Sequence, residues 1–364
     1  MIVSNDVVHD GRVLKEAKAL SAAGHDVRFI GWDRSGRAPE RTTWEGLEIR
    51  YVRTRGLLRV LGRDVLRNPA WWRRADMLAR REPFDAVHCH DLDTLPIGVR
   101  LKKSFRTPLV YDAHEVFGYM IEHDVPRFVT DYAFRMERRL APQVDRVIAV
   151  NDFVKAYIDS VSGHEAIVVR NCPVVVLPEY RSTPSPPFTL LYIGTLHPSR
   201  FVLEAIETVA EMPEISLVVG GSKALTPIVR DMCARQPNTR FVGVVPNTQV
   251  LPMTVDSHAV LSMFDPAQRI NQVGLPNKIF EAMAAGRPSI VAQGLPMSDL
   301  VLRERCGLAV PYTKTGLRSA IEQLRKDLSL AETLGRNGLE AAKQRYNWPM
   351  ESKKLIAIYS GLRP

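Results

Sequence analysis

The feature that most limits the possible folds is an alternation of short apolar runs with longer amphipathic segments, repeated along almost the whole 364-residue chain. The apolar runs are rich in β-branched residues, as buried strands of a parallel sheet are, and the segments between them have helical spacing. The expected strands are residues 1–5, 27–31, 86–90, 109–112, 146–150, 189–193, 215–219, 240–242, 259–263 and 289–292, and the expected helices include 12–23, 200–210 and 277–285. This alternation predicts an α/β protein with doubly wound parallel sheets.

Two domains are indicated by the chain length and by one break in the alternation. At residues 181–188 the sequence RSTPSPPF is rich in Pro and Ser, which is typical of a linker. A chain of 364 residues also exceeds one comfortable core. We therefore expect two Rossmann-like domains facing each other across a cleft, with the ligand site in that cleft. Their expected bounds are 1–172, a linker at 173–188, 189–342, and a helix at 343–364 that returns to the N-terminal domain.

Composition indicates a cytoplasmic protein. The sequence has no apolar stretch near the roughly 18 residues that a membrane-spanning helix needs, and no secretory signal pattern at its start. The four cysteines are scattered without metal-ligand spacing, so we expect reduced thiols.

The net charge of +9 is concentrated in one segment. Ten arginines lie between residues 50 and 81, opposed within that segment only by Asp64 and Asp76. In GLLRVLGRDVLRN (56–68) the arginines have helical spacing opposite the leucines, and Trp71 and Trp72 follow. This composition fits a helix on an anionic membrane surface, and it fits equally well a helix whose leucines pack on the domain. We expect contact with the inner face of the plasma membrane through the segment from Arg53 to Arg81. We expect no nucleic-acid partner, because aromatic residues are not interleaved with the arginines.

Two segments in the second half have the residues that a diphosphate site requires. In LLYIGTLHPSRF a strand ends before Gly194, where the backbone can approach a ligand closely, and Arg200 lies near the start of the next helix. Helix amides and a guanidinium both bind phosphate oxygens. In GLPNKIFEAMAAGRP a turn leads into a helix that places Lys278 and Glu281 on one face. Each feature alone also fits a tight turn, a solvated arginine or a carboxylate that complements a helix dipole, and Gly220 is a weaker candidate.

Three expected strand ends in the first half are followed by polar residues. Asp10-Gly11-Arg12 opens the first helix, and the acidic and histidine residues that follow two later strands are Asp91, Asp93, His114 and Glu115. His88, His90 and His114 could suggest a metal site, but histidines on strands are more often packed or hydrogen-bonded, so we expect none. A hydrolase using Asp91 or Asp93 with Glu115 would not need a diphosphate clamp in the other half.

Taken together, these segments resemble a known family. The string LPNKIFEAMAAGRPSIVA, with RFVGVVPNTQVLPMTVDSHAVLSMF before it, resembles the donor domain of retaining glycosyltransferases with the GT-B fold, of the glycosyltransferase family 4 type. GRVLKEAKALSAAGHDV, DAVHCHDLDTLP, LVYDAHEVF and VIAVNDFV resemble successive strand ends of the same family. The resemblance covers nearly the whole chain.

The resemblance implies roles for individual residues. Arg200, Lys278 and His114 would be catalytic: the two cations neutralise the leaving diphosphate, and His114 lies beside the sugar and acceptor. Glu281 matches the second glutamate of the E-x7-E motif, which binds the nucleotide ribose. The donor-binding set would be Gly11, Arg12, Gly194, Thr195, Arg200, Gly220, Val244, Gly274, Leu275, Pro276, Asn277, Lys278 and Glu281, and the acceptor set Asp91, Asp93, His114 and Glu115.

There are two departures from the family pattern. The first glutamate of the motif is replaced by Val273, and the usual arginine after the glycine is Thr195. Contacts to the sugar hydroxyls would then come from Asn271, Gln272 or the backbone at Gly274 and Leu275.

The function implied is a retaining, metal-independent transfer of a sugar from a nucleotide diphosphate, with UDP favoured and no cofactor. The acceptor would be a glycan or a lipid-linked group in cell-surface polysaccharide or glycolipid synthesis. Alternatives are a nucleotide-sugar epimerase of the same fold, or a non-catalytic protein that binds nucleotide sugars or nucleic acid.

Overall fold

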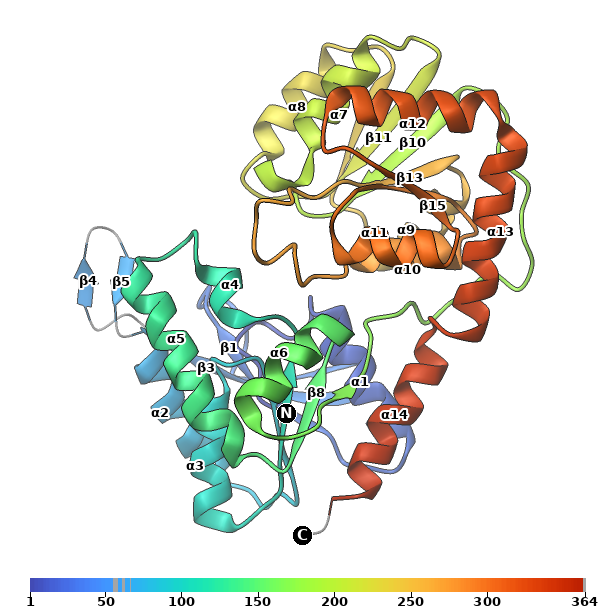
Figure 1. Ribbon diagram of the computed structural model, residues 1–364. Coiled ribbons are helices and arrows are strands. Elements are labelled where there is room, and N and C mark those ends of the chain that lie inside the picture. The colour runs from blue at the N-terminus through green and yellow to red at the C-terminus, as the bar shows by residue number, and fades with distance from the viewer. Residues whose placement is uncertain (55–57, 61–62, 66, 363–364) are drawn as a thin grey trace. The chain divides into compact units, whose positions relative to one another are not determined.

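The computed structural model describes residues 1–54, 58–60, 63–65 and 67–362, without the side chains of 58–60, 63–65 and 67 (Figure 1). It divides into two compact units: Met1–Arg170 together with Glu351–Pro364, and Asn171–Met350. In the part of the chain that is described, no helix is both long enough and apolar enough to cross a membrane.

The first unit is built on one mainly parallel sheet. Its strands are β1 (Arg28–Asp33), β2 (Arg41–Trp44), β3 (Leu47–Arg53), β6 (Val87–His90), β7 (Leu109–Ala113), β8 (Arg146–Ala149) and β9 (Ile167–Val168). β1, β3 and β2 are neighbours in that order, with β2 antiparallel, and β6 to β9 follow one another in parallel. Ile2 forms parallel bridges to both Ile30 and Cys89, so the first residues of the chain join the two groups of strands.

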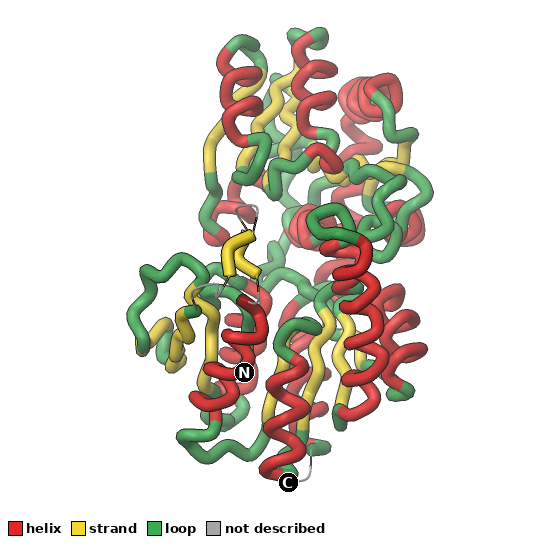
Figure 2. The backbone as a smooth tube through the Cα atoms, turned by 90° about the vertical axis from the view of Figure 1, so that its left-hand side faces the viewer, coloured by secondary structure: helices red, strands yellow, loops and turns green. Residues whose placement is uncertain are grey.

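Helices cover both faces of this sheet (Figure 2). They are α1 (Gly11–Ala22), α2 (Arg67–Ala79), α3 (Leu95–Phe105), α4 (Phe117–Ile121), α5 (Arg127–Leu140), the 3₁₀ turn η1 (Ala141–Gln143), α6 (Asp152–Ser162) and, from the chain's end, α14 (Trp348–Ser360). A Cβ on Gly98 of α3 would lie 2.4 Å from Cys89 Sγ, so α3 packs closely on the Cys89 face of β6. Because successive side chains alternate, His88 and His90 point to the other face. There they meet Glu16 of α1 and Tyr359 of α14.

The second unit contains a fully parallel sheet of order β12-β11-β10-β13-β14-β15. The strands are β10 (Phe188–Ile193), β11 (Ile215–Gly220), β12 (Thr239–Gly243), β13 (Ala259–Ser262), β14 (Ser289–Ala292) and β15 (Gly307–Val310). The strand order reverses between β10 and β13, and open α/β sheets bind ligands beyond the carboxyl ends of the strands at such a point. The prediction of doubly wound α/β units is confirmed.

The helical elements of the second unit are η2 (Pro198–Arg200), α7 (Val202–Ala210), α8 (Thr226–Ala234), α9 (Asn247–Val255), α10 (Asn277–Ala284), α11 (Pro296–Arg303), α12 (Lys314–Lys326) and α13 (Leu328–Gln344). The expected helix 200–210 is divided: η2 is a 3₁₀ turn, Phe201 adopts φ 57°, and α7 starts only at Val202. Arg200 is therefore not in the first turn of α7.

The expected linker, 173–188, is held against the second unit. Arg287 is almost fully buried and donates hydrogen bonds to the carbonyl oxygens of Arg181, Ser182 and Val255. The Leu177 amide donates to the Ala284 carbonyl at 3.0 Å. These bonds explain why the second unit begins at Asn171 rather than at the strand β10.

The helix expected at 56–68 is wrong where the structure describes it. β4 (Leu58–Val60) and β5 (Arg63–Val65) form a two-stranded antiparallel hairpin, and a helix begins only at Arg67. A short isolated helix without tertiary packing is marginal. The remaining residues, 55–57, 61–62 and 66, lie outside the described part of the chain.

Candidate active site

The end of β10 approaches the next strand closely at two glycines. A Cβ on Gly221 would lie 1.8 Å from the Gly194 carbonyl oxygen, and Gly221 has φ 137°, so no other residue fits there. A Cβ on Gly194 would lie 3.0 Å from Lys278 Nζ. Gly221 thus allows the close approach of the two loops, and Gly194 lies beside the Lys278 ammonium at the carboxyl edge of the sheet.

Lys278 is buried in the first turn of α10, with 8% of its surface exposed. Its Nζ lies 3.7 Å from the centre of the Tyr192 ring and 5.6 Å from that of Phe264. Both rings are buried and present their electron-rich faces to the cation. The N-cap position of α10 is Pro276, whose side chain has no acceptor for the first amides of the helix.

Arg200 lies beside Lys278 on the same aromatic support. Its guanidinium carbon is 3.7 Å from the centre of the Phe264 ring, and its Nη1 donates to Asn271 Oδ1 at 2.7 Å. Asn271 is 2% exposed and donates from Nδ2 to the Asp265 carbonyl. Asn271 is thus occupied with Arg200 on one side and with the chain on the other. The structure thus brings Asn271 to Arg200, and its role as one of the possible sugar contacts stays a prediction.

Lys278 and Arg200 are two cations close together in a buried site, so each makes the charged form of the other less stable. Burial first, and then the charge of Arg200, lower the pKa of Lys278 to about 7, against a smaller opposing effect of Glu281. An anion bound between the two cations would reverse this penalty. The geometry of the second unit therefore fits a phosphate or diphosphate at the β10–β13 switch point.

The other candidates of the second unit lie around this edge. Thr195 is exposed directly after Gly194, and Val244 is 72% exposed after β12. A Cβ on Gly220 would lie 2.7 Å from the Val245 side chain, so the segment that contains Val244 adjoins β11. Gly274, Leu275 and Pro276 form the half-buried turn before α10, where Asn277 is exposed and Glu281 half-buried. Gln272 is exposed and donates to the Pro266 carbonyl.

In the first unit, His114 lies between two carboxylates. Its Nδ1 is 3.3 Å from Asp91 Oδ2, and its Nε2 is 3.0 Å from Asp112 Oδ2. Its backbone amide donates to Asp91 Oδ1 at 3.0 Å. Burial opposes the charged ring, but Asp91 and Asp112 outweigh burial and raise the pKa of His114 to about 10.

Arg12 is placed differently from the sequence prediction. It is 5% exposed, and its guanidinium pairs with Asp112 Oδ1 at 2.9 Å and with Glu16 Oε1 at 3.0 Å. Its Nη1 donates to the Val169 carbonyl at 2.8 Å. The guanidinium is therefore engaged by Asp112, Glu16 and the Val169 carbonyl within the unit, and the donor-binding role of Arg12 stays a prediction. Gly11, also predicted to bind the donor, is the half-buried first residue of α1.

Asp91 and Asp93 follow β6, at the carboxyl edge of the sheet. Asp91 has φ 62°, a conformation that Asp tolerates better than most residues, and its amide donates to the Asp112 carbonyl. Burial, assisted by Asp93 and Glu115, raises the pKa of Asp91 to about 7 although His114 opposes the shift. The predicted acceptor residues differ in exposure: Asp93 is buried, Asp91 and His114 are half-buried, and Glu115 is exposed.

Sequence reasoning missed Glu16 and Tyr359, and it noted Asp112 only as one of the polar residues beside His114. His88 Nδ1 lies 2.7 Å from Tyr359 Oη, and its Nε2 lies 3.7 Å from Asp112 Oδ2. The rings of His88 and His90 stack with centres 4.2 Å apart. Asp112 lies in β7, two residues before His114. Tyr359 has no sequence signal, because it comes from a helix 271 residues further along the chain.

Glu16, His88, His90 and Asp112 offer ligand atoms that lie within 4.8 Å of one another, so this cluster was tested as a metal site. Two carboxylates and two imidazoles suit a transition metal such as zinc. However, Arg12 already pairs with both carboxylates and supplies the positive charge that a metal would bring. The arrangement fits an ion-pair network better than a metal centre.

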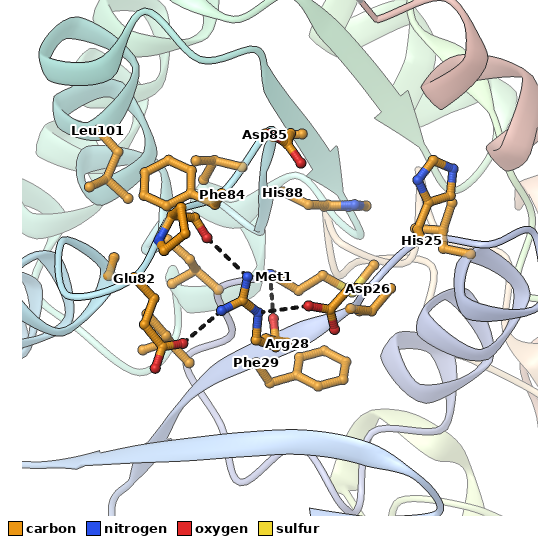
Figure 3. A pocket seen from close by; sticks show the side chains of 18 of the residues that line it. Met1, His25, Asp26, Arg28, Phe29, Glu82, Phe84, Asp85, His88 and Leu101 are labelled. Carbon is orange, nitrogen blue, oxygen red and sulfur yellow. Dashed lines mark hydrogen bonds and ion pairs between the residues drawn. The ribbon is translucent and has the colours of Figure 1, made fainter. Parts of the chain in front are cut away.

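A cavity of about 250 Å³ lies where the strands β1 and β6 of the first unit's sheet begin, opposite the carboxyl edge (Figure 3). Its wall includes Arg28, which pairs with Glu82 at 2.7 Å, and Phe84. It adjoins the starts of β1 and β6, whereas α/β sheets bind ligands at strand ends. We therefore place the site at His114 rather than in this cavity.

The basic segment is more neutralised than its sequence indicates. Arg50 pairs with Glu48 and Glu82, and Arg53 pairs with Asp33, all from outside the segment. Trp71 is fully buried and stacks on Trp32, and Trp72 is half-buried and donates to the Asp93 carbonyl. Neither tryptophan is available to a membrane, which corrects that part of the prediction.

Comparison with known proteins gives matches over most of the chain. Residues 12–178 match the model described as Glycosyltransferase Family 4, and residues 187–327 match the model described as Glycosyl transferases group 1. An uncharacterized glycosyltransferase of Methanocaldococcus jannaschii is 21% identical over 377 aligned residues, covering 94% of this chain and 91% of the relative.

Solved structures share the fold over the full length. Sucrose-phosphate synthase from Thermosynechococcus elongatus has a TM-score of 0.80 at 18% identity, covering 99% of this chain and 97% of that one. HepE from Anabaena, solved in complex with UDP-glucose, has a TM-score of 0.71 at 15% identity, covering 99% of both chains.

Proposed function

The chain belongs to glycosyltransferase family 4, whose members use nucleotide-sugar donors, and we propose that it transfers a sugar from a UDP-sugar to an acceptor hydroxyl with retention of configuration. The observation that carries this proposal is the pair of cations, Lys278 and Arg200, supported on Tyr192 and Phe264 at the end of β10. UDP is favoured because a protein of the same fold, HepE, was solved with UDP-glucose.

Lys278 and Arg200 stabilise the negative charge that develops on the leaving diphosphate. Preorganised cations and amides do this without a metal ion, because they are already aimed at the position where the charge appears. A charge-assisted hydrogen bond is worth about 1.5–3 kcal/mol. If that interaction forms only in the transition state, each residue contributes roughly tenfold to a hundredfold in rate.

In the proposed step, the acceptor oxygen attacks the anomeric carbon on the face that the diphosphate leaves. The bond from that carbon to the diphosphate oxygen breaks, and the departing diphosphate takes the acceptor proton. No side chain is needed as general base. His114, with Asp91, Asp93 and Glu115 around it, binds the sugar and the acceptor.

We propose further that the acceptor is a glycan or lipid-linked group reached at an anionic membrane surface, as on the inner face of the plasma membrane. The support comes from α5 rather than from the tryptophans. Phe128 and Tyr132 of α5 are 70% and 53% exposed. At helical spacing from them stand the exposed Arg135 and Arg139. A face with exposed aromatics and arginines fits the interface of an anionic bilayer.

A thermal-shift screen with UDP-, GDP- and dTDP-glucose tests the donor. A ligand that binds only the folded state raises its apparent stability, by about 2.7 kcal/mol at one hundred times the dissociation constant. We expect the largest shift with UDP-glucose, and a much smaller shift in Lys278→Met. Equal shifts for all three nucleotides would contradict the choice of UDP.

Co-sedimentation with vesicles of anionic phospholipid tests the membrane proposal. Phe128→Ser with Tyr132→Ser should reduce the bound fraction severalfold at low salt, whereas Met350→Ser, an exposed apolar residue of the second unit, should not. Equal binding by all three proteins, or none by the wild type, would refute contact through α5.

A further inference from the structure

We infer that His114 is held as a permanently charged imidazolium between Asp91 and Asp112, and that Asp112 and Arg12 are its positioning residues. The charge state is a property of the first unit alone. Its use in sugar transfer rests on the proposed function.

The geometry at the two ring nitrogens supports the charged form. Nδ1 faces Asp91 Oδ2 at 3.3 Å, and Nε2 faces Asp112 Oδ2 at 3.0 Å. Arg12 keeps Asp112 ionised, and an ionised carboxylate only accepts, so Nε2 carries the proton that it donates to Asp112. A second proton on Nδ1 makes the ring the cation that forms an ion pair with Asp91. A neutral ring would turn a lone pair toward one of the two carboxylates. The amide bond from His114 N to Asp91 Oδ1 fixes the backbone in the same arrangement.

Arg12 holds Asp112 in the ionised and oriented state that this role requires. The guanidinium reaches Asp112 from two of its nitrogens, Nη2 at 2.9 Å to Oδ1 and Nε at 3.4 Å to Oδ2. Its third nitrogen is fixed by the Val169 carbonyl. Burial opposes ionisation of Asp112, but Arg12 and then His114 outweigh it and keep the pKa of Asp112 well below its ordinary value. Contact with both carboxylate oxygens of Asp112 needs the planar guanidinium, which the ammonium of a lysine cannot reproduce.

Several other ionisable groups face His114 or its two carboxylates. From α1 these are Arg12 and Glu16; from β6 and the residues after it, His88, His90 and Asp93; from the residues after β7, Glu115; and from α14, Tyr359. His90 Nδ1 lies 3.2 Å from His114 Nε2. Burial and the neighbouring His88 lower the pKa of His90 well below its ordinary value, so His90 is neutral and adds no competing charge.

The consequence for the reaction is that His114 has no lone pair with which to accept a proton. It cannot be the base that deprotonates the acceptor. It can place a positive charge and a polarised ring edge beside the sugar, with 16% of its side chain accessible. The acceptor proton must then leave with the diphosphate.

Histidine Cε1–H resonances followed by NMR over pH test this inference directly. The chain has nine histidines, and the His114 signal is assigned by its loss in His114→Gln. We expect the wild-type signal to stay at the protonated position between about pH 6 and about pH 8.5, where an ordinary histidine would titrate. In Asp112→Asn the midpoint should fall into that window, because one of the two carboxylates is gone.

Glu137→Gln is the matched control. Glu137 is also a buried carboxylate of the first unit, but it accepts from Tyr111 and Tyr157 and makes no contact with His114. It should leave the His114 signal unchanged. Titration of wild-type His114 near pH 6.5, or an unchanged signal in Asp112→Asn, would overturn the inference. Neither result depends on sugar transfer, so a failure here is distinct from a failure of the proposed function.

The pH profile of UDP release from UDP-glucose gives a second measurement. In Asp112→Asn the rate should acquire a falling limb at the pH where the NMR signal titrates, and the wild type should lack it. Arg12→Lys keeps the positive charge but loses the two-nitrogen contact with Asp112, so the rate of UDP release should fall at least about tenfold. Its midpoint of thermal unfolding should stay close to that of Glu137→Gln. Full activity of Arg12→Lys would contradict the positioning role.

Discussion

The ammonium group of Lys278 lies 3.7 Å from the centre of the Tyr192 ring, in a place where a side chain on Gly194 would leave no room for it. The cation is thus held by an aromatic face rather than by a carboxylate partner. A carboxylate would neutralise it, whereas an aromatic ring leaves the charge available to an anion. This arrangement is the basis of the predictions that follow.

Lys278→Ala should lower the rate of UDP release at least about tenfold, because the charge facing the leaving diphosphate is lost. The fold should persist, since the change removes a buried cation. Lys326→Ala is the control: Lys326 is exposed and pairs only with Glu322 one helical turn away. Steady-state kinetics with thermal unfolding of both variants provides the check, and an unchanged rate in Lys278→Ala would count against the donor site.

Asn271→Ala should reduce turnover about as much as Arg200→Ala, because Asn271 Oδ1 accepts a hydrogen bond from the guanidinium that lies over Phe264 and so orients it. In a double-mutant cycle the two effects should not add, and the double variant should be within about threefold of Arg200→Ala. Gln272→Ala, an exposed neighbour, should behave as wild type. If the loss of turnover in the double variant equals the product of the two single losses, Asn271 and Arg200 act independently, which would contradict the prediction.

Gly221→Ala should destabilise the second unit by at least about 2 kcal/mol, because its Cβ meets the Gly194 carbonyl oxygen, which is backbone and cannot move aside. Gly243→Ala is the matched change: Gly243 also has a positive φ, 73°, but its Cβ would meet nothing within 4 Å. That change should cost about 1 kcal/mol from backbone strain alone. Denaturant unfolding of the two variants makes the comparison, and equal losses would contradict the close approach.

Arg287→Met should lower the unfolding midpoint of the second unit strongly, with a loss of at least about 3 kcal/mol. The carbonyl of the buried Val255 would lose its donor, and the carbonyls of Arg181 and Ser182 would lose the bonds that hold their segment to Arg287. Arg235→Met, at an exposed position, should change stability by less than about 0.5 kcal/mol. Calorimetry distinguishes the two, and similar midpoints would mean that Arg287 does not secure the 173–188 segment.

Much of this fold could be predicted from the sequence because the strands of parallel sheets are buried on both faces. Runs such as residues 289–292 (SIVA) are mostly apolar and buried throughout, and that strand was predicted at its observed bounds. The antiparallel pair β2 and β3 was missed, since β2 is mostly exposed and lacks an apolar pattern. The helix at 56–68 was wrong because helical spacing of arginines does not supply tertiary packing.

The site was predictable where a motif fixes both residue type and position, as for Lys278 and Arg200. It was not predictable where a partner comes from another part of the chain. Arg12 is at the expected helix start, but Asp112, one hundred residues away, determines where its guanidinium points. Asn271 was assigned to the sugar because nothing in the sequence indicates that Arg200 would occupy its side-chain oxygen.

Proton uptake during UDP binding tests the central claim most directly. The pKa of Lys278 is about 7 in the free protein, so at pH 8 most of the side chain is neutral, and a diphosphate beside it should raise that pKa and draw in a proton. Calorimetric titration with UDP at pH 8, in two buffers of different ionisation enthalpy, should give an uptake approaching one proton per site, falling toward zero near pH 6 and absent in Lys278→Met. If UDP binds with the same proton uptake in wild type and Lys278→Met, the diphosphate is not bound where this account places it.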